Sequence, residues 1–310
     1  MPSAAAVLKQ ETHKGSSAGS WRDRLVLGTA TFHENYGITN KGGASDPRRY
    51  WQLLETCLDH GIKKIDTAAA YGEAERLLGE FGMSRFAVIT KVRCEESQAG
   101  KDLEGKLVES LQRLKISRCY GLLLHNDQAL SGPHGEKIAE ALRRLSRKGL
   151  AEKVGISSYD PLSARTLSQK HGLHLLQVPC NPMDRRVLEA GLLGQWAEEG
   201  VEVHVRSIFL QGLLLRDLPN SARQSPVVPL AMARLFREKC QMAGVSPLHA
   251  CLSFVWNASP EVQMVIGPTT AEELRQIAEY RPGQPLVESN WLPGWDSNFD
   301  PRTWESSCPQ

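Results

Sequence analysis

The sequence lacks an excess of charge of one sign. Its 37 Lys and Arg residues nearly balance 35 Asp and Glu residues, which leaves a net charge of +2. Proteins that hold nucleic acid through phosphate contacts usually carry a clear basic surplus, so nucleic acid is not an expected partner. With 41% hydrophobic and 23% charged residues among 310, the composition instead suits a soluble enzyme with one large core.

The first 20-odd residues also lack the apolar core of a signal peptide or a membrane-spanning segment. They are rich in Ala, Ser and Gly, and we expect residues 1–24 to form a disordered tail. The seven cysteines include no C-x-x-C pair, and most lie in or beside apolar runs, as reduced core thiols do. These features predict a cytoplasmic protein with no membrane partner. No metal site is predicted, because His171 and His174 straddle Gly172 at a helix-to-strand turn.

Short apolar runs alternate with longer stretches of helical period from Leu25 onward. This alternation is typical of repeated strand–helix units around a parallel sheet. Eight candidate strands can be counted, and most are continuous apolar runs, as expected for strands covered on both faces. They are residues 25–31, 64–66, 86–91, 120–125, 153–157, 173–179, 202–208 and 262–267.

The stretches between these strands carry clear helix signals. Ser45-Asp46-Pro47 supplies a cap and a first-turn proline for a helix that ends near Gly61. Further helices are expected near residues 103–114, 138–149, 161–171, 188–199, 229–243, 247–257 and 271–279. Eight strands with eight crossovers predict an α/β protein with one (β/α)8 barrel, covering residues 25–310. Its irregular, aromatic C-terminal tail, residues 282–310, either covers the barrel mouth or packs along its flank.

Three of the predicted strands deliver titratable side chains at their carboxyl ends, where parallel barrels keep their chemistry. These side chains are Asp66, Lys91 and His125, and Tyr71 follows Asp66 closely. An adjacent ammonium group favours phenolate, so Lys91 is expected to lower the pKa of Tyr71. Tyr71 would then protonate the alkoxide left when a hydride reaches a carbonyl. Asp66 would orient Lys91, and His125 would bond the substrate oxygen.

The chain resembles an aldo-keto reductase over essentially all of residues 25–304. Its L-G-T-A run at residues 27–30 is similar to the first strand of that family, and residues 66–72 are similar to its D-T-A-x-x-Y-G signature. Lys91 and His125 match the remaining catalytic positions. The resemblance implies a (β/α)8 barrel that uses NADP(H) or NAD(H) to interconvert a small-molecule carbonyl and an alcohol.

Two further stretches resemble a bacterial subgroup of the family named for spore-coat polysaccharide synthesis. They are the Y-G-I-T-N loop at residues 36–40 and the H-V-R-S run at residues 204–207. The subgroup implies a sugar-like substrate.

The resemblance also assigns residues to the cofactor. Near nicotinamide and pyrophosphate it places Gly28, Thr29, Ser157, Gln177, Arg206, Ser207, Leu210 and Gly212. The chain departs from the family at Ser158, where Asn is usual, and at Arg206, where an aromatic residue commonly stacks on nicotinamide. A planar Arg can stack on a ring, but it adds positive charge beside a cofactor that becomes cationic when oxidised.

The turn and helix after the last strand bear on coenzyme choice. The resemblance places Gly267, Thr269 and Glu273 at the adenosine end of the cofactor, where family members that grip a 2′-phosphate usually have Lys or Arg. A carboxylate is unfavourable near a phosphate but can accept a hydrogen bond from a ribose 2′-hydroxyl. With Arg275 as the only cation in this segment, we expect poor discrimination in favour of NADPH, or acceptance of NADH as well.

The loops expected around the substrate are polar, which predicts a hydroxylated or anionic substrate rather than a steroid or lipid. Their polar residues are His33, Glu34, Asn35, Tyr36, Asn40, Asn126, Asp127 and Arg206. Arg206 would either pair with a substrate charge or anchor the nucleotide. Two alternatives remain open: a non-catalytic regulatory or binding protein on the same barrel, and a nicotinamide-using epimerase or imine reductase.

Overall fold

Eight strands close into a barrel in which every neighbouring pair is parallel. This computed structural model describes residues 20–32, 47–224, 227–281, 291–292, 295 and 297–300. The predicted single (β/α)8 barrel is confirmed. Its strands are β1 (Leu25–Gly28), β2 (Lys64–Asp66), β3 (Ala87–Val92), β4 (Cys119–Leu124), β5 (Ala151–Ser157), β6 (Leu175–Pro179), β7 (Glu202–Arg206) and β8 (Gln263–Ile266).

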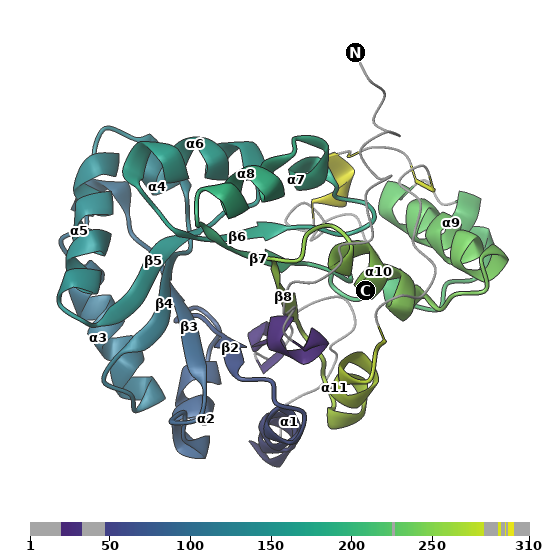
Figure 1. Ribbon diagram of the computed structural model, residues 1–310, viewed down its shortest axis with the longest axis horizontal. Helices are drawn as coiled ribbons and strands as arrows, with labels where there is room; N and C mark the ends of the chain where they lie inside the picture. Colours follow the sequence, from purple (N-terminus) through teal and green to yellow (C-terminus); the bar gives the residue numbers. More distant parts are fainter. Residues whose placement is uncertain are drawn as a thin grey trace.

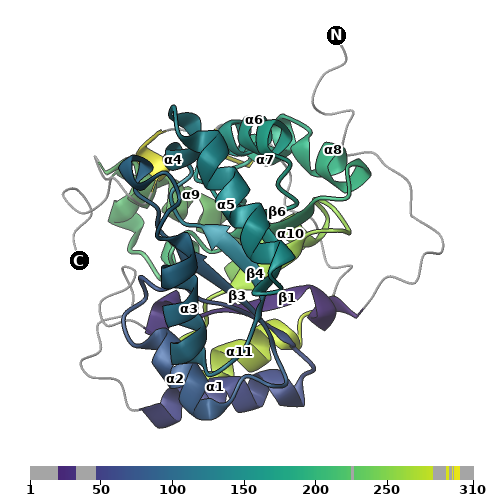
Figure 2. The ribbon, with the colours of Figure 1, turned by 90° about the vertical axis from the view of Figure 1, so that its left-hand side faces the viewer.

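Helices surround the barrel on its outer side (Figures 1 and 2). The main ones are α1 (Pro47–Asp59), α2 (Ala74–Phe81), α3 (Leu103–Leu114), α5 (Gly135–Arg147), α6 (Pro161–His171), α9 (Val228–Met242), α10 (Pro247–Trp256) and α11 (Ala271–Ala278). Shorter ones are α4 (Gln128–Ser131), α7 (Arg186–Glu189) and α8 (Leu192–Glu198). α2 is not among the predicted helices, and the left-handed Gly191 divides the single helix predicted at residues 188–199 into α7 and α8. No helix of the described residues is both long and apolar enough to cross a membrane.

Two strands end at least two residues earlier than the sequence predicts. The chain leaves β1 after Gly28 and forms a short 3-10 helix, Ala30–Phe32. It leaves β7 after Arg206 because Ser207 adopts a positive φ of 58°, which an extended strand cannot accommodate. Both breaks lie at the carboxyl end of the barrel, so they turn the chain into the loops that surround the site.

The prediction of a disordered tail is wrong for its last four residues, 21–24. Residues 21–24 form a 3-10 helix, and the Trp21 side chain is buried. Its ring packs edge-on against Trp256 and Tyr280, and its indole N–H donates to the Ile277 carbonyl at 3.2 Å. Burial of this aromatic surface holds residues 21–24 against the barrel. Residues 1–19, the loop residues 33–40 and most of the segment 282–310 lie outside the described residues.

A polar cluster occupies the amino-terminal end of the barrel interior. The Glu202 carboxylate accepts hydrogen bonds from Lys64 at 3.1 Å, Lys153 at 2.5 Å and Tyr120 at 2.5 Å. Burial raises the pKa of Glu202, but its bonds with His204, Lys153 and Tyr120 outweigh burial and hold that pKa well below its usual range. The charged Glu202 carboxylate, with its hydrogen bonds satisfied, therefore occupies the amino-terminal end of the barrel interior.

An apolar layer lies above this cluster, made by Val26, Ile89, Leu123 and Leu175 from four different strands. Gly121 leaves room for it, since a Cβ there would lie 2.6 Å from Leu175. The barrel is thus a packed core, and the opposite, carboxyl end remains for the predicted site.

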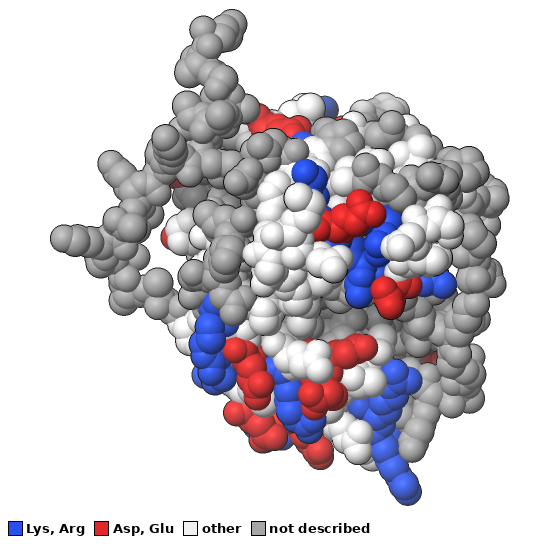
Figure 3. Space-filling view, turned by 90° about the vertical axis from the view of Figure 1, so that its right-hand side faces the viewer, with Lys and Arg blue, Asp and Glu red and all other residues white. Residues whose placement is uncertain are grey.

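The outer surface mixes charges of both signs. On the side of the molecule that carries α9, Lys and Arg lie beside Asp and Glu (Figure 3). Arg234 pairs with Glu238 within α9, and Arg237 pairs with Asp217. Interspersed charges of this kind agree with the near-zero charge balance of the sequence.

Candidate active site

A buried ion pair forms the base of the site. The Lys91 ammonium on β3 donates to Asp66 Oδ1 at 2.5 Å and to the Thr67 carbonyl at 2.9 Å. Its side chain has no exposed surface. Gln177 on β6 donates to Asp66 Oδ2 at 2.7 Å and accepts from Ser157 at 3.2 Å. Both carboxylate oxygens are therefore bonded, which a buried charge requires.

Strand pairing fixes the position of Asp66. The Thr29 amide and hydroxyl both donate to the Asp66 carbonyl, at 2.9 and 3.1 Å. Gly28 pairs with Asp66 across β1 and β2, and its lack of a side chain lets β8 pack closely against it, because a Cβ there would lie 3.0 Å from a Val265 methyl group and 3.2 Å from the Ile266 carbonyl. In this structure Gly28 and Thr29 support the β2 end. Their assignment to the cofactor stays a proposal.

Tyr71 lies between this ion pair and His125. Its ring makes an edge-on contact with the His125 ring, with centroids 5.9 Å apart, and the Lys91 ammonium lies 5.1 Å from its centroid. The Tyr71 amide donates to the Ala68 carbonyl, so the loop after β2 folds back as a tight turn. The structure therefore brings together the four residues that the sequence singled out.

The expected lowering of the Tyr71 pKa by Lys91 is wrong for the free protein. Burial raises the pKa of Tyr71 above its ordinary value, the Asp66 carboxylate adds to the rise, and the Arg206 guanidinium opposes it. Lys91 and Asp66 form an ion pair, so the ammonium does not act alone on the phenol. Tyr71 consequently keeps its proton at neutral pH, as a proton donor must.

His125 is neutral for related reasons. Burial lowers its pKa to about 3, and the positive charges of Lys91, Arg93 and Arg206 act in the same direction. Its Nδ1 has no hydrogen-bond partner among the described residues. A neutral imidazole can offer one N–H to a substrate oxygen without adding charge.

We expect the His125 imidazole to stay neutral to about pH 3 in the folded protein. The unfolded chain takes up this proton from roughly pH 6.5 downward, so the stability linked to His125 is full above that pH. It is lost as the pH falls from 6.5 toward 3. Histidine ¹⁵N NMR of the free protein measures the pKa directly, and a midpoint near 6.5 would contradict the assignment. His125→Gln should flatten unfolding stability against pH over the same window.

Polar residues of the β4 loop connect it to the β3 and β5 loops on either side. Asn126 donates to the Cys94 carbonyl at 2.8 Å and accepts from its amide at 3.1 Å. The Ser158 hydroxyl donates to Asp127 at 2.5 Å and accepts from the Asp160 amide at 3.0 Å. Ser158 thus connects the β4 loop to the β5 loop. Of the residues expected around the substrate, His33, Glu34, Asn35, Tyr36 and Asn40 lie outside the described residues.

The loop after β7 has the form of an anion cradle. Ser207, Leu210 and Gln211 have positive φ values of 58°, 49° and 54°, and Gly212 follows at 86°. Left-handed non-glycine residues are costly and gather at functional sites. The N–H groups of Phe209 and Gln211 find no acceptor among the described residues. The resemblance assigns Ser207, Leu210 and Gly212 of this loop to the pyrophosphate, and that role stays a proposal.

The turn before α11 uses the residues expected at the adenosine end. Thr270 caps α11 by accepting from the Glu273 amide at 3.2 Å, and the Glu273 carboxylate accepts from the Thr269 amide at 2.6 Å. Arg275 pairs with Glu272. Nothing crowds Gly267, since a Cβ there would meet only a Thr31 methyl group at 3.7 Å.

Arg49 is a second cation at this turn, and the sequence analysis missed it. It comes from α1, and its Nε donates to the Thr269 carbonyl at 2.6 Å. The two residues lie far apart in the sequence, yet barrel closure makes the first and last helices neighbours. The predicted barrel closure was therefore a signal that could have placed Arg49 near Thr269.

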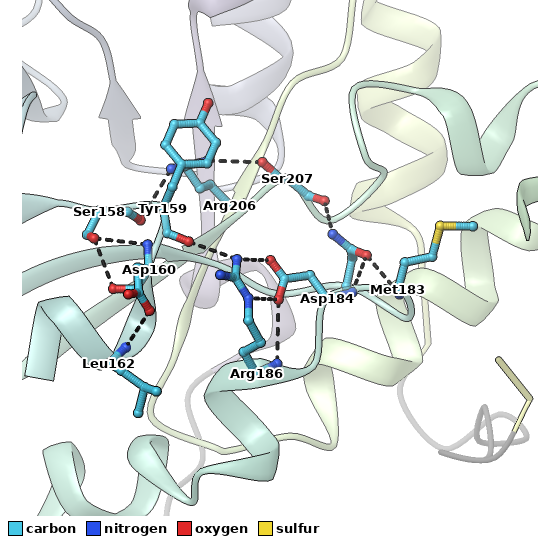
Figure 4. Close-up of polar contacts among 10 residues, drawn as sticks. Ser158, Tyr159, Asp160, Leu162, Met183, Asp184, Arg186, Arg206 and Ser207 are labelled. Atoms are coloured by element: carbon cyan, nitrogen blue, oxygen red, sulfur yellow. Dashed lines mark hydrogen bonds and ion pairs between the residues drawn. The ribbon is translucent and has the colours of Figure 1, made fainter. Parts of the chain in front are cut away.

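Arg206 lies against an aromatic ring of the protein itself. Its guanidinium carbon is 3.8 Å from the centroid of the Tyr159 ring, and its N–H groups donate to the Ser158 carbonyl at 3.3 Å and to the Ser207 hydroxyl at 3.2 Å (Figure 4). No carboxylate of the described residues forms an ion pair with it. Tyr159 is not among the predicted site residues, because a lone tyrosine in a loop carries no sequence signal.

Comparisons with known proteins point to one family. The sequence model of the Aldo/keto reductase family matches residues 24–291. D-arabinose 1-dehydrogenase from Saccharomyces cerevisiae is 29% identical over 147 residues, which span 44% of this chain and 42% of that protein. The chain thus covers less than half the length of this relative. D-threo-aldose 1-dehydrogenase from a Pseudomonas species is 23% identical over 79% of this chain and 88% of that protein.

Solved structures share the fold. An aldo-keto reductase from Bacillus halodurans in its holo form has a TM-score of 0.67 and 22% identity, covering 84% of this chain and 87% of that one. An aldo-keto reductase from Klebsiella pneumoniae in complex with NADPH has a TM-score of 0.59 and 21% identity, covering 82% and 84%. At these identities the likeness concerns the barrel alone.

Proposed function

Because the chain belongs to the aldo/keto reductase family, we propose that it is a nicotinamide-dependent oxidoreductase that interconverts a carbonyl and an alcohol. The substrate is a polar, hydroxylated small molecule, and Tyr71 is the general acid and base. One observation carries the proposal: the Tyr71 ring contacts both the His125 ring and the ammonium of the buried Lys91–Asp66 ion pair. This arrangement suits an oxygen that gains negative charge as it is reduced.

Each residue has a separate task in this proposal. The Tyr71 hydroxyl donates its proton to the substrate oxygen during reduction, and the phenolate takes a proton back during alcohol oxidation. The His125 N–H bonds the same oxygen and fixes its position. The Lys91 ammonium lies beneath the Tyr71 ring and stabilises negative charge there, while Asp66 holds that ammonium in place.

The chain's own residues also fit the cofactor, which supplies the hydride when bound. Ser157 and Gln177 present a hydroxyl and an amide at the carboxyl ends of β5 and β6, where a carboxamide can exchange hydrogen bonds with them. The unbonded N–H groups of the β7 loop suit phosphate oxygens. Thr269 and Glu273 form the turn that would face the adenosine ribose.

A sugar-like substrate draws support from two sources. The names of two relatives identify them as dehydrogenases of D-arabinose and of D-threo-aldoses. Among the described loops at the barrel mouth, the β5 loop carries Tyr159 and β7 ends with Arg206, and these polar side chains suit a hydroxylated substrate better than an apolar one.

The test follows the absorbance of reduced nicotinamide with a panel of aldoses, simple aldehydes and apolar ketones. We expect turnover that is most efficient with the hydroxylated members. Nucleotide binding without turnover of any member would favour a non-catalytic binding protein. Conversion of a sugar without net consumption of nucleotide would favour an epimerase.

Coenzyme choice is a further expected result. The Glu273 carboxylate lies in the turn before α11, where the adenosine end of the cofactor is expected. Arg49, the second cation at this turn, already donates a hydrogen bond to the Thr269 carbonyl. We therefore expect dissociation constants for NADPH and NADH to differ by less than about a hundredfold, or about 2.7 kcal/mol. Fluorescence titration with both reduced nucleotides measures the ratio, and Glu273→Gln should move it toward NADPH. A larger preference for NADPH in the unaltered protein would contradict the expectation and would make Arg49 the cation to replace.

A further inference from the structure

Arg206 carries a charge that no described carboxylate neutralises. Its bonds to the Ser158 carbonyl and the Ser207 hydroxyl use two of the five N–H donors of the guanidinium group, and one of its faces lies against Tyr159. The side chain is only partly exposed. A partly buried cation without a counter-ion is costly, and an incoming anion would relieve that cost.

Neighbouring residues hold both contacts of Arg206 in place. The Tyr159 carbonyl accepts from Arg186 at 2.8 Å, and Arg186 forms a two-pronged ion pair with Asp184, at 2.8 and 2.7 Å. The buried Asn181 donates to the Ser207 carbonyl at 3.0 Å and accepts from the Asp184 amide at 3.0 Å. Figure 4 shows these bonds as one continuous network. The guanidinium is therefore fixed before any ligand arrives.

The charge also acts on the catalytic pair. The positive charge of Arg206 opposes the raised pKa of Tyr71 and adds to the lowered pKa of His125. A group with this effect on both side chains lies near the place where they would hold a substrate oxygen. An anionic group bound by Arg206 would then belong to the same small molecule as the reacting carbonyl.

We propose that Arg206, stacked on Tyr159, binds a carboxylate of the substrate, so that the protein acts on carbonyl compounds that are also acids. This specificity role rests on the proposed function. The planar N–H fork of Arg matches the two oxygens of a carboxylate. A carboxylate is favoured over a phosphate because one cation matches its single charge.

The experiment compares substrates that differ only by a carboxylate in place of CH₂OH: glyoxylate with glycolaldehyde, and D-glucuronate with D-glucose. A charge-assisted bond predicts that, in at least one pair, kcat/KM of the anionic member exceeds that of the neutral member by about 10- to 100-fold. This comparison needs only the unaltered protein. Equal or lower efficiency of the anionic member in both pairs would overturn the proposal.

Arg206→Met then removes the charge while keeping an unbranched side chain. We expect the anionic preference to disappear and the dissociation constant for reduced nucleotide to change by less than about threefold, or about 0.7 kcal/mol. The matched control is Arg93→Met, because Arg93 is an exposed cation whose charge also reaches His125. The proposal would be overturned if Arg93→Met lost the anionic preference equally. It would also be overturned if Arg206→Met kept that preference and bound reduced nucleotide more weakly.

Binding separates this inference from the proposed function. Calorimetric titration measures D-glucuronate against D-glucose in the presence of oxidised nucleotide. Tighter binding of glucuronate that disappears in Arg206→Met supports the carboxylate site, whether or not the protein turns over any substrate. A lack of turnover beside such binding counts against the proposed function alone. Turnover of neutral sugars with no glucuronate preference in rate or binding counts against the carboxylate site alone.

Discussion

Tyr71→Phe is expected to lower kcat for carbonyl reduction by about 10²- to 10⁴-fold, the usual size of a lost general acid. The substitution removes only a hydroxyl and keeps the ring that contacts His125. Reduced nucleotide should therefore bind with an unchanged dissociation constant. Steady-state rates and fluorescence titration on the same preparation measure both quantities.

A matched control distinguishes this effect from general disturbance. Tyr280→Phe makes the same chemical change in a buried residue that packs on Trp21, ahead of β1 at the other end of the barrel. We expect its turnover to equal that of the unaltered protein. Turnover of Tyr71→Phe within about threefold of this control, or about 0.7 kcal/mol, would remove Tyr71 from the mechanism.

Lys91→Met has the second large expected effect, and it should reduce both stability and activity. The substitution leaves the Asp66 carboxylate buried without its cation, and breaking a buried pair in this way typically costs about 3–5 kcal/mol. Denaturant unfolding measures the free-energy loss. Carbonyl reduction should fall strongly as well, since no ammonium then stabilises negative charge near Tyr71.

The double variant Asp66→Asn/Lys91→Met separates the two effects. It removes both charges and keeps an amide at position 66 that can still bond Gln177. We expect most of the lost stability to return, while activity stays low. A double variant no more stable than Lys91→Met would show that the loss came from packing rather than from an unpaired charge.

The sequence predicted that Asp66, Lys91 and His125 lie at one end of the barrel, because each stands at or next to the end of a short run that is typical of a buried strand. Parallel strands of one barrel bring such ends together whatever the loops do. The site therefore followed from the order of strands.

The ionisation of Tyr71 did not follow from the sequence. Its pKa depends on how deeply the ring is buried and on the Lys91–Asp66 pair, and neither is visible in the order of residues. The prediction of a lowered pKa for Tyr71 took account only of the attraction between the Lys91 ammonium and a phenolate. Burial, which favours the neutral phenol, is the stronger effect in the free protein.

Contacts between distant loops could not be predicted from the sequence either. Nothing in the pattern around Tyr159 indicates that its ring supports Arg206. Asp127 was expected to face the substrate because it is polar and follows a strand, yet it bonds Ser158 of the next loop. A polar residue at a strand end can contact a substrate or bond to a neighbouring loop. Only the three-dimensional arrangement shows which of these two roles it has.

Isotope transfer tests the central claim most directly. The protein is incubated with an aldose and with reduced nucleotide that carries deuterium at the transferable position, and the product is analysed by mass spectrometry. Nicotinamide-dependent reduction predicts one deuterium on the new carbinol carbon, with the yield reduced about 10²-fold or more in Tyr71→Phe. A product without deuterium, or equal incorporation in the unaltered protein and in Tyr71→Phe, would contradict the account.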